Sequence, residues 1–423
     1  MKTSTSLLPS PTNRKMITFV MTCQYNGFAY AGFQRQTRTP TPEEITAPGM
    51  KRKRNQTDNV KASATKNSNK SVKKPSAVVT VQDKIEHALH KWTGLSLSTL
   101  RVRGAGRTDK GVHATNQIVA FDVPQSSLVD VEVGEVSNEK ISDQALPLLK
   151  EAHEMLVSYD TSTKETRPII DQWKIKRAIS TRLPTDIVIR TIRIWNGSTP
   201  FEARHHVACK TYTYRLRFRC TASATNNATS NEAQPNMHPI CKAGPYLLRR
   251  LNDNNNIWLS PWPLDKDKLR QACKPFVGRH DFCNFVHKAE RKAANTRPSL
   301  IRRSERYQHS SSEEANNDNL KFVMNLFEFN LDLTSEEEVD KTLPPIINAT
   351  FSLKAKGFHR SQVRNLVGFV VDVARGERVQ DDAKLLLGEK DGANNEKEMP
   401  IVNSAPACGL CLSNVEYEHD EFV

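Results

Sequence analysis

The chain has 423 residues, of which 61 are Lys or Arg and 47 are Asp or Glu, so its formal net charge at pH 7 is +14. This excess suits a polyanionic partner, but a basic protein that binds no nucleic acid would have the same totals. No run of about 18 apolar residues occurs, which argues against a membrane-spanning helix. The eight cysteines are scattered, and Cys408 and Cys411 form one C-x-x-C without a second pair at a zinc-binding spacing. We therefore expect an intracellular, reducing compartment and no metal site.

Several segments contain too few apolar residues to bury a core of their own, and we predict that they are flexible insertions on the surface: 37–78, 125–170, 221–240, 306–319 and 388–400. The basic run at residues 51–54 is typical of a nuclear localisation signal, of an additional nucleic-acid tether or of a solvated loop, and the sequence leaves these alternatives open. Residues 1–13 lack the apolar core of a secretory signal, and we expect a flexible N-terminus.

The first strongly periodic segment begins after Thr80, a residue type that commonly caps helices. Ile85, Ala88, Leu89 and Trp92 then recur with helical spacing. This pattern predicts an amphipathic helix from about residue 81 to residue 92.

Residues 103–113 place one carboxylate, Asp109, among three glycines and several cationic side chains, including Arg103, Arg107 and Lys110. These cations favour the ionised carboxylate, and closely spaced glycines permit φ > 0 and a close approach to a ligand. The segment is neither a phosphate loop nor a dinucleotide fingerprint, because no Gly-Lys-Ser/Thr follows it and residues 118–123 alternate as a strand. It is either a catalytic loop or an ordinary turn in which Asp109 pairs with Arg107.

Two further elements lie later in the chain. In residues 211–219 the apolar side chains of Tyr212 and its alternating neighbours face one side, and Arg215, Arg217 and Arg219 face the other. This alternation predicts a half-buried strand with a basic outer face. Apolar residues from Val363 to Ala374 form one stripe of a helix that ends near residue 376. The elements together indicate the α+β class.

Residues 106–114, Gly-Arg-Thr-Asp-Lys-Gly-Val-His-Ala, resemble the signature of the TruA family of tRNA pseudouridine synthases. Further segments resemble the family's other motifs in the expected order: 25–36, 80–82, 183–187, 201–204 with 210–214, 278–285, 358–368 and 405–412. The resemblance implies the pseudouridine synthase fold, with two α+β halves (14–199 and 200–420) around an extended, mainly antiparallel sheet and a basic central cleft.

The same resemblance implies roles for individual residues. Asp109 would be the catalytic residue, Tyr212 would lie against the target base, and Arg364 would pair with the Asp109 carboxylate. Without the resemblance, the pattern predicts that Tyr212 packs in the core and that the Arg364 side chain extends along the apolar stripe toward solvent. Arg107 would displace the target nucleotide. Other residues of the motifs are expected to contact RNA: Arg103, Lys110, His113, Arg35, Arg204, Lys210 and Arg360.

Members of this family isomerise uridine without a cofactor, so none is expected here. Gly111-Val112-His113-Ala114 favours the bacterial-like branch, although the long insertions suggest a eukaryotic member. The branch implies action on uridines 38, 39 and 40 of the tRNA anticodon arm, by a homodimer. Three alternatives remain: a tRNA-binding chaperone without activity, a synthase of a related eukaryotic branch with other tRNA sites, and a phosphate-processing enzyme. The last needs a carboxylate cluster near residues 104–123, where only Asp109 and Asp122 occur.

Overall fold

The computed structural model describes residues 6–7, 16–35, 78–124, 157–159, 168–170, 172–197, 200–221, 248, 253, 255–291, 322–336, 344–388 and 402–418. Most of the predicted insertions lie outside these residues. A small antiparallel sheet has the order β1-β6-β5. Its strands β1 (Ser6–Leu7), β5 (Val157–Tyr159) and β6 (Pro168–Ile170) fall within the ranges expected to be flexible.

A ten-stranded sheet runs through the rest of the described chain, with β10-β11-β12-β8-β13-β4-β2-β7 in order, β3 beside β4 and β9 beside β8. Its strands are β2 (Met16–Tyr25), β3 (Arg103–Gly104), β4 (His113–Pro124), β7 (Ile187–Ile194), β8 (Val207–Arg219), β9 (Trp258–Leu259), β10 (Gly278–Asp281), β11 (Val323–Ser335), β12 (Ile346–Ala355) and β13 (Leu410–Tyr417). Neighbouring strands are antiparallel except in the pairs β13–β4 and β8–β9. The predicted α+β class and mainly antiparallel sheet are confirmed.

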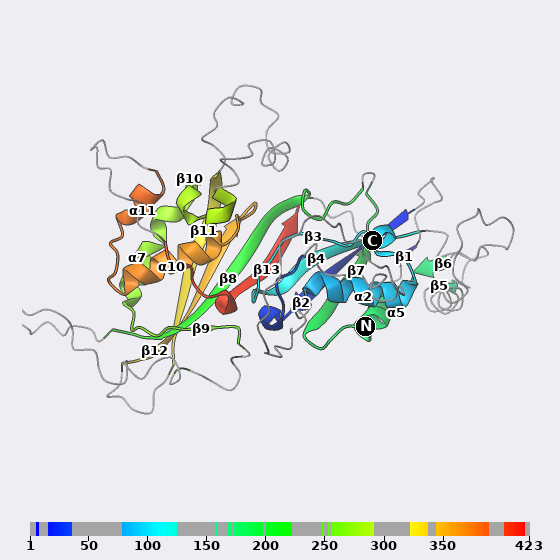
Figure 1. Ribbon diagram of the computed structural model, residues 1–423, viewed down its shortest axis with the longest axis horizontal. Helices are drawn as coiled ribbons and strands as arrows, with labels where there is room; N and C mark the ends of the chain where they lie inside the picture. The colour runs from blue at the N-terminus through cyan, green and yellow to red at the C-terminus, as the bar shows by residue number, and fades with distance from the viewer. Residues whose placement is uncertain are drawn as a thin grey trace, which may run out of the picture.

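Helices accompany each half of this sheet (Figure 1). Figure 1 shows α2 and α5 beside β2, β4 and β7, and α7 and α10 beside β8, β11 and β12. The helices are α2 (Val81–Thr93), α3 (Leu97–Leu100), α5 (Gln172–Ser180), α7 (Lys266–Ala272), α10 (Gln362–Ala374) and α11 (Asp382–Leu386). Short 3-10 turns are η1 (Gly27–Ala29), η4 (Lys274–Phe276), η5 (Cys283–Phe285) and η7 (Ala407–Gly409). No described helix has the length and hydropathy needed to cross a membrane.

The predicted helices are confirmed in their positions and in their buried faces. Helix α2 begins at a reciprocal cap, in which Thr80 Oγ1 accepts from the Asp83 backbone N–H and Asp83 accepts from the Thr80 N–H. Its predicted apolar residues, including Ile85 and Leu89, are buried. In α10 the predicted stripe from Val363 to Ala374 is buried as well. These two faces anchor the helices to a core that is continuous through both halves.

The prediction of a basic outer face on β8 was wrong for two of its three arginines. Arg215 is exposed, but Arg217 and Arg219 are buried. Arg217 donates to the Asp253 carboxylate at 2.8 Å, and Arg219 donates to the Pro344 carbonyl at 2.7 Å. Segments distant in the chain therefore cover this face of β8 and provide the hydrogen-bond partners of its arginines. The alternating pattern within β8 alone does not reveal these partners.

The two halves of the sheet meet at β13. Its residue Leu412 is opposite Tyr212 of β8 on one side and opposite Ala114 of β4 on the other. The residues just before Ala114 form the loop that carries Asp109. The fold thus brings the predicted catalytic loop and Tyr212, which are far apart in sequence, to the junction between the halves.

Candidate active site

Residues 105–112, which we call the Asp109 loop, rest on a buried polar network. Gln117 of β4 is fully buried, and its side chain both accepts from the Gly106 N–H at 3.1 Å and donates to the Gly106 carbonyl at 2.8 Å. The hydroxyls of Thr108 and Tyr25 are hydrogen-bonded to each other at 2.9 Å. These bonds hold Gly106 and Thr108 against strands β4 and β2. The side chain of Arg107 is exposed, and that of Asp109 is partly exposed.

A second segment, residues 27–33, packs along the Asp109 loop. The Phe33 N–H donates to the Thr108 carbonyl at 3.0 Å, and the Gly111 N–H donates to the Tyr30 carbonyl at 3.3 Å. This close approach requires glycine at position 27, because a Cβ there would lie 1.8 Å from the Val112 carbonyl oxygen. The motif at residues 25–36 therefore builds the wall of the Asp109 loop.

The glycines of residues 103–113 serve different purposes. Gly111 has φ of +78°, as the sequence suggested. Gly104 is instead required by packing, since a Cβ there would lie 2.4 Å from the ring of Phe33. At Gly106 the nearest atoms to a Cβ would be 3.6 Å or more away, and one of them is the Tyr212 hydroxyl oxygen.

The Asp109 carboxylate lies beside the guanidinium of Arg360. Arg360 Nε is 3.6 Å from Asp109 Oδ1, and 32% of the Asp109 side chain is exposed. Tyr212 is 8% exposed, and its ring meets that of Phe358 edge-on with centroids 5.3 Å apart. Burial, and secondarily the charge of Asp109, raise the pKa of Tyr212, so its hydroxyl stays protonated at neutral pH.

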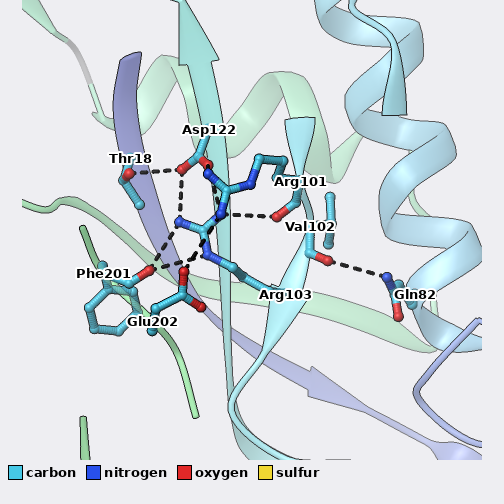
Figure 2. Close-up of polar contacts among 8 residues, drawn as sticks. All are labelled: Thr18, Gln82, Arg101, Val102, Arg103, Asp122, Phe201 and Glu202. Carbon is cyan, nitrogen blue, oxygen red and sulfur yellow. Dashed lines mark hydrogen bonds and ion pairs between the residues drawn. The ribbon is translucent and has the colours of Figure 1, made fainter. Parts of the chain in front are cut away.

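Arg103 is engaged in a different cluster, shown in Figure 2. Its guanidinium donates to both carboxylate oxygens of buried Asp122, at 2.8 and 2.9 Å, and also to the Phe201 carbonyl at 3.0 Å. Arg101 adds ion pairs to Asp122 and Glu202. This cluster joins β3 and β4 to the turn at residues 201–204, which carries Arg204.

Lys210 of β8 contacts the start of the Asp109 loop, and Arg204 lies in the turn that precedes β8. Lys210 Nζ donates to the Ala105 carbonyl at 2.8 Å. Burial, with a contribution from the charge of Arg204, lowers the pKa of Lys210 to about 8. Burial and the charge of Arg107 likewise lower the pKa of Arg204.

A family model described as tRNA pseudouridine synthase matches residues 272–418. Over 340 residues the chain is 24% identical to tRNA pseudouridine synthase A 1 of Bacillus cereus, which covers 80% of this chain and 90% of that protein. It is 23% identical over 339 residues to tRNA pseudouridine synthase A of Limosilactobacillus reuteri, covering 80% and 88% of the two chains. It is 25% identical over 338 residues to the Maridesulfovibrio salexigens protein of the same name, covering 80% and 82%. These matches support the TruA family of tRNA pseudouridine synthases, which the sequence motifs resemble.

The structure does not place Arg364 within ion-pair distance of Asp109, which is the pairing that the resemblance implies. Arg364 Nε donates to the Ala405 carbonyl at 2.6 Å, and its own carbonyl accepts from the Ala405 N–H at 2.9 Å. Arg360, which precedes α10, contacts Asp109 instead. Arg364 is therefore tied to the segment before η7, and its link to the Asp109 loop is indirect.

Three residues expected to contact RNA have structural partners. Arg103 pairs with Asp122, as described above. Arg35 pairs with Asp83 at 2.9 Å and with Glu86, which fixes it to the start of α2. His113 is buried and accepts from the Gly27 N–H at 3.2 Å, and burial lowers its pKa. Their charges or polar atoms are engaged within the protein, whereas Lys110, Arg107 and Arg360 are exposed.

Sequence reasoning did not single out Gln117, Thr108 or Phe358 as parts of the site. Gln117 carries the one available signal, a polar amide next to the apolar run from Ile118. A buried amide needs partners, and those partners are the backbone groups of Gly106. Within the described residues no group of His, Cys, Asp or Glu side chains is arranged to hold a metal ion.

Proposed function

We propose that this protein converts uridine to pseudouridine in tRNA, at positions 38, 39 and 40 of the anticodon arm, with Asp109 as the nucleophile. The observation that carries the proposal is the placement of Asp109: a partly exposed carboxylate on a loop held by buried hydrogen bonds, with the Arg360 guanidinium 3.6 Å away. The basic composition and the names of the curated relatives support tRNA as the substrate.

The reaction detaches uracil from C1′ of the ribose, rotates the base and rejoins it through C5. The bond that breaks is inaccessible within a stacked helix, so the nucleotide must leave the stack, which costs a few kcal/mol. Exposed Arg107, two residues before Asp109, is suited to occupy the vacated position. The aromatic pair of Tyr212 and Phe358 offers an apolar surface for the flipped base.

As a nucleophile Asp109 acts through its carboxylate, and the Arg360 guanidinium lies 3.6 Å from that group. The carboxylate would attack C1′, add to C6 or remove the C2′ proton. The raised pKa of Tyr212 makes its phenol a poor base at neutral pH. We therefore assign Tyr212 to contact with the base, and not to removal of the C5 proton by a phenolate.

The decisive test is Asp109→Asn, which keeps the shape of the side chain and removes its charge. We expect normal tRNA binding by filter assay and no pseudouridine, measured by carbodiimide-dependent reverse-transcription stops. The same mapping in tRNA from cells with and without the protein identifies the modified positions. Product formation by the purified variant near the wild-type rate would refute the role of Asp109, and an inactive wild-type protein that binds tRNA would favour the chaperone alternative.

A further inference from the structure

The segment before α10, residues 357–361, contacts the candidate site at two points. Its Phe358 ring meets the ring of Tyr212 edge-on, and its Arg360 guanidinium lies 3.6 Å from the Asp109 carboxylate. The position of this segment therefore determines where a cation lies beside the reacting group.

This segment is irregular, and contacts from outside are needed to keep its shape. Ser361, the N-cap residue of α10, has a φ of +61°, and within the described chain its side chain makes no capping hydrogen bond. Left-handed backbone is unfavourable for serine and persists where the surrounding structure enforces it. From the side of the helix, the Gln362 side chain accepts from the His359 N–H at 2.9 Å.

A carboxylate from a distant part of the chain, Glu290, holds the other side of the segment. One of its oxygens lies 3.2 Å from Nδ1 of His359, and the other accepts from the Arg360 backbone N–H at 3.0 Å. The Arg360 carbonyl accepts from the His287 N–H at 3.1 Å. Residues 287–290 therefore bond both backbone polar groups of Arg360.

The turn that carries Glu290 is itself anchored to the fold. The Asn365 side chain of α10 donates to the Phe285 carbonyl at 2.6 Å, and Arg291 donates to the Asn284 side chain at 3.2 Å. Burial acts to raise the pKa of Glu290, but the hydrogen bond and charge of His359, with smaller contributions from Arg360, outweigh burial and lower this pKa. Glu290 is thus an ionised acceptor on a fixed turn.

We propose that Glu290 is a positioning residue, which holds residues 359–360 so that the Arg360 guanidinium lies beside Asp109. The proposal rests on the proposed function, because it takes Asp109 to be the reacting group. The hydrogen bonds of the Glu290 side chain go to His359 and Arg360, so its effect on the reaction passes through this segment.

The first test is the single-turnover rate of pseudouridine formation in tRNA. We expect Glu290→Ala to lower this rate about tenfold, and to lower tRNA affinity in filter binding by less, because a small displacement of a group beside the reacting atoms is costly. Glu290→Gln keeps an oxygen that can accept from the Arg360 N–H, so it should restore most of the rate.

Asp265→Ala is the matched control. Asp265 also accepts from two backbone N–H groups, those of Asp267 and Lys268 at 2.9 and 3.1 Å, but it caps α7. Its loss should lower the melting temperature about as much as Glu290→Ala does and leave the rate unchanged.

A double-mutant cycle tests whether Glu290 acts through Arg360. Glu290→Ala should lower the rate clearly less in an Arg360→Met background than in the wild type. The proposal is overturned if the two effects on the rate are additive, if Glu290→Gln is as slow as Glu290→Ala, or if Asp265→Ala loses as much rate as Glu290→Ala.

Hydrogen exchange gives a readout that does not depend on turnover. Because Glu290→Ala removes the acceptor of the Arg360 N–H, the peptide covering residues 358–361 should exchange faster, whereas Asp265→Ala should leave its exchange unchanged. Unchanged exchange of this peptide in Glu290→Ala would overturn the proposal. Absence of product with the wild-type protein would instead refute the proposed function, so the two failures are distinguishable.

Discussion

Arg360 precedes α10 and Arg364 lies in its first turn, yet of the two only Arg360 lies within ion-pair distance of Asp109. Arg364 instead donates to the Ala405 carbonyl, just before the turn η7. Residues 405–407 of that segment are further held by the Tyr214 hydroxyl, which donates to the Pro406 carbonyl at 2.8 Å. The Cβ of Ala407 would be 3.4 Å from a Cβ placed on Gly111. Arg364 is therefore a positioning residue for the Asp109 loop.

From this chain of contacts we expect Arg364→Met to lower the turnover number by roughly 10- to 100-fold, because small displacements of a catalytic group are costly. Affinity for tRNA should change little, since Arg364 is bonded within the protein. Single-turnover kinetics and filter binding separate the two quantities. An unchanged turnover number together with weakened binding would place Arg364 on the RNA-binding surface instead.

Lys210 gives the site a pH dependence whose sign follows from its lowered pKa of about 8. The resemblance implies that Lys210 contacts RNA, whose phosphates favour the charged ammonium, so binding takes up a proton wherever the free side chain is neutral. Lys210 donates to the Ala105 carbonyl, and the charge of Arg204 adds to the effect of burial on its pKa. We expect tRNA affinity to be constant below about pH 7 and to fall as pH rises toward about 9, by up to tenfold per unit above the pKa.

Lys210→Arg is the control for this prediction, because a guanidinium stays charged up to pH values above about 12. Its affinity should be nearly independent of pH over the same range, while other titrating groups affect both proteins equally. Equal pH profiles for Lys210→Arg and the wild type, measured by filter binding, would contradict the prediction.

What sequence reasoning could and could not find is clearest for single residues. Helical spacing predicted the buried faces of α2 and α10, and the catalytic role that the contiguous motif gives to Asp109 stays a prediction. The partners of charged residues were not predictable, because they come from distant segments: Asp122 for Arg103, Asp253 for Arg217 and Ala405 for Arg364. A local pattern can indicate that a buried arginine needs hydrogen-bond partners, but only the tertiary structure shows which residues provide them.

At the scale of elements, the site depends on how closely the turn η1 approaches the end of the Asp109 loop. Asn26 caps η1 by accepting from the Phe28 N–H at 3.1 Å, and the Gly27 N–H donates to His113. At Gly27 there is no room for a side chain, whereas Gly106 has ordinary van der Waals space around it. Substitution of Gly106 by alanine is therefore a control for the same substitution at Gly27.

We expect Gly27→Ala to displace η1 from the Asp109 loop, lower the free energy of unfolding by about 2 kcal/mol and reduce turnover. Gly106→Ala should leave the free energy of unfolding within about 0.5 kcal/mol of the wild-type value. Urea denaturation of both variants measures the difference. Comparable stability of the two variants would show that η1 can move away from Val112 without cost, and that the close contact is not needed for folding.

At the scale of the whole molecule, the family resemblance implies a homodimer in which each tRNA touches both subunits. The anticodon arm lies far from the tRNA elbow, and two copies provide a longer continuous basic surface than one. Binding should weaken steeply between roughly 50 and 200 mM salt, as expected when several phosphates are neutralised. The long basic segment at residues 40–75, which lies outside the described residues, could contribute to this charge without belonging to the catalytic body.

Deletion of residues 40–75 tests whether this segment adds to tRNA binding without belonging to the catalytic body. The described residues on either side of the segment are hydrogen-bonded to each other: the Ala31 N–H donates to the Val79 carbonyl at 3.0 Å, and the Gln82 N–H donates to the Phe33 carbonyl at 2.9 Å. A short connection therefore suffices to join them, and the wall of the Asp109 loop should be preserved. We expect the shortened protein to remain a dimer by light scattering, to modify the same uridines and to bind tRNA only modestly more weakly by filter assay. A change in the modified position would mean that the segment selects the target, and a fully active monomer with salt-insensitive binding would contradict the dimeric, phosphate-based model of recognition.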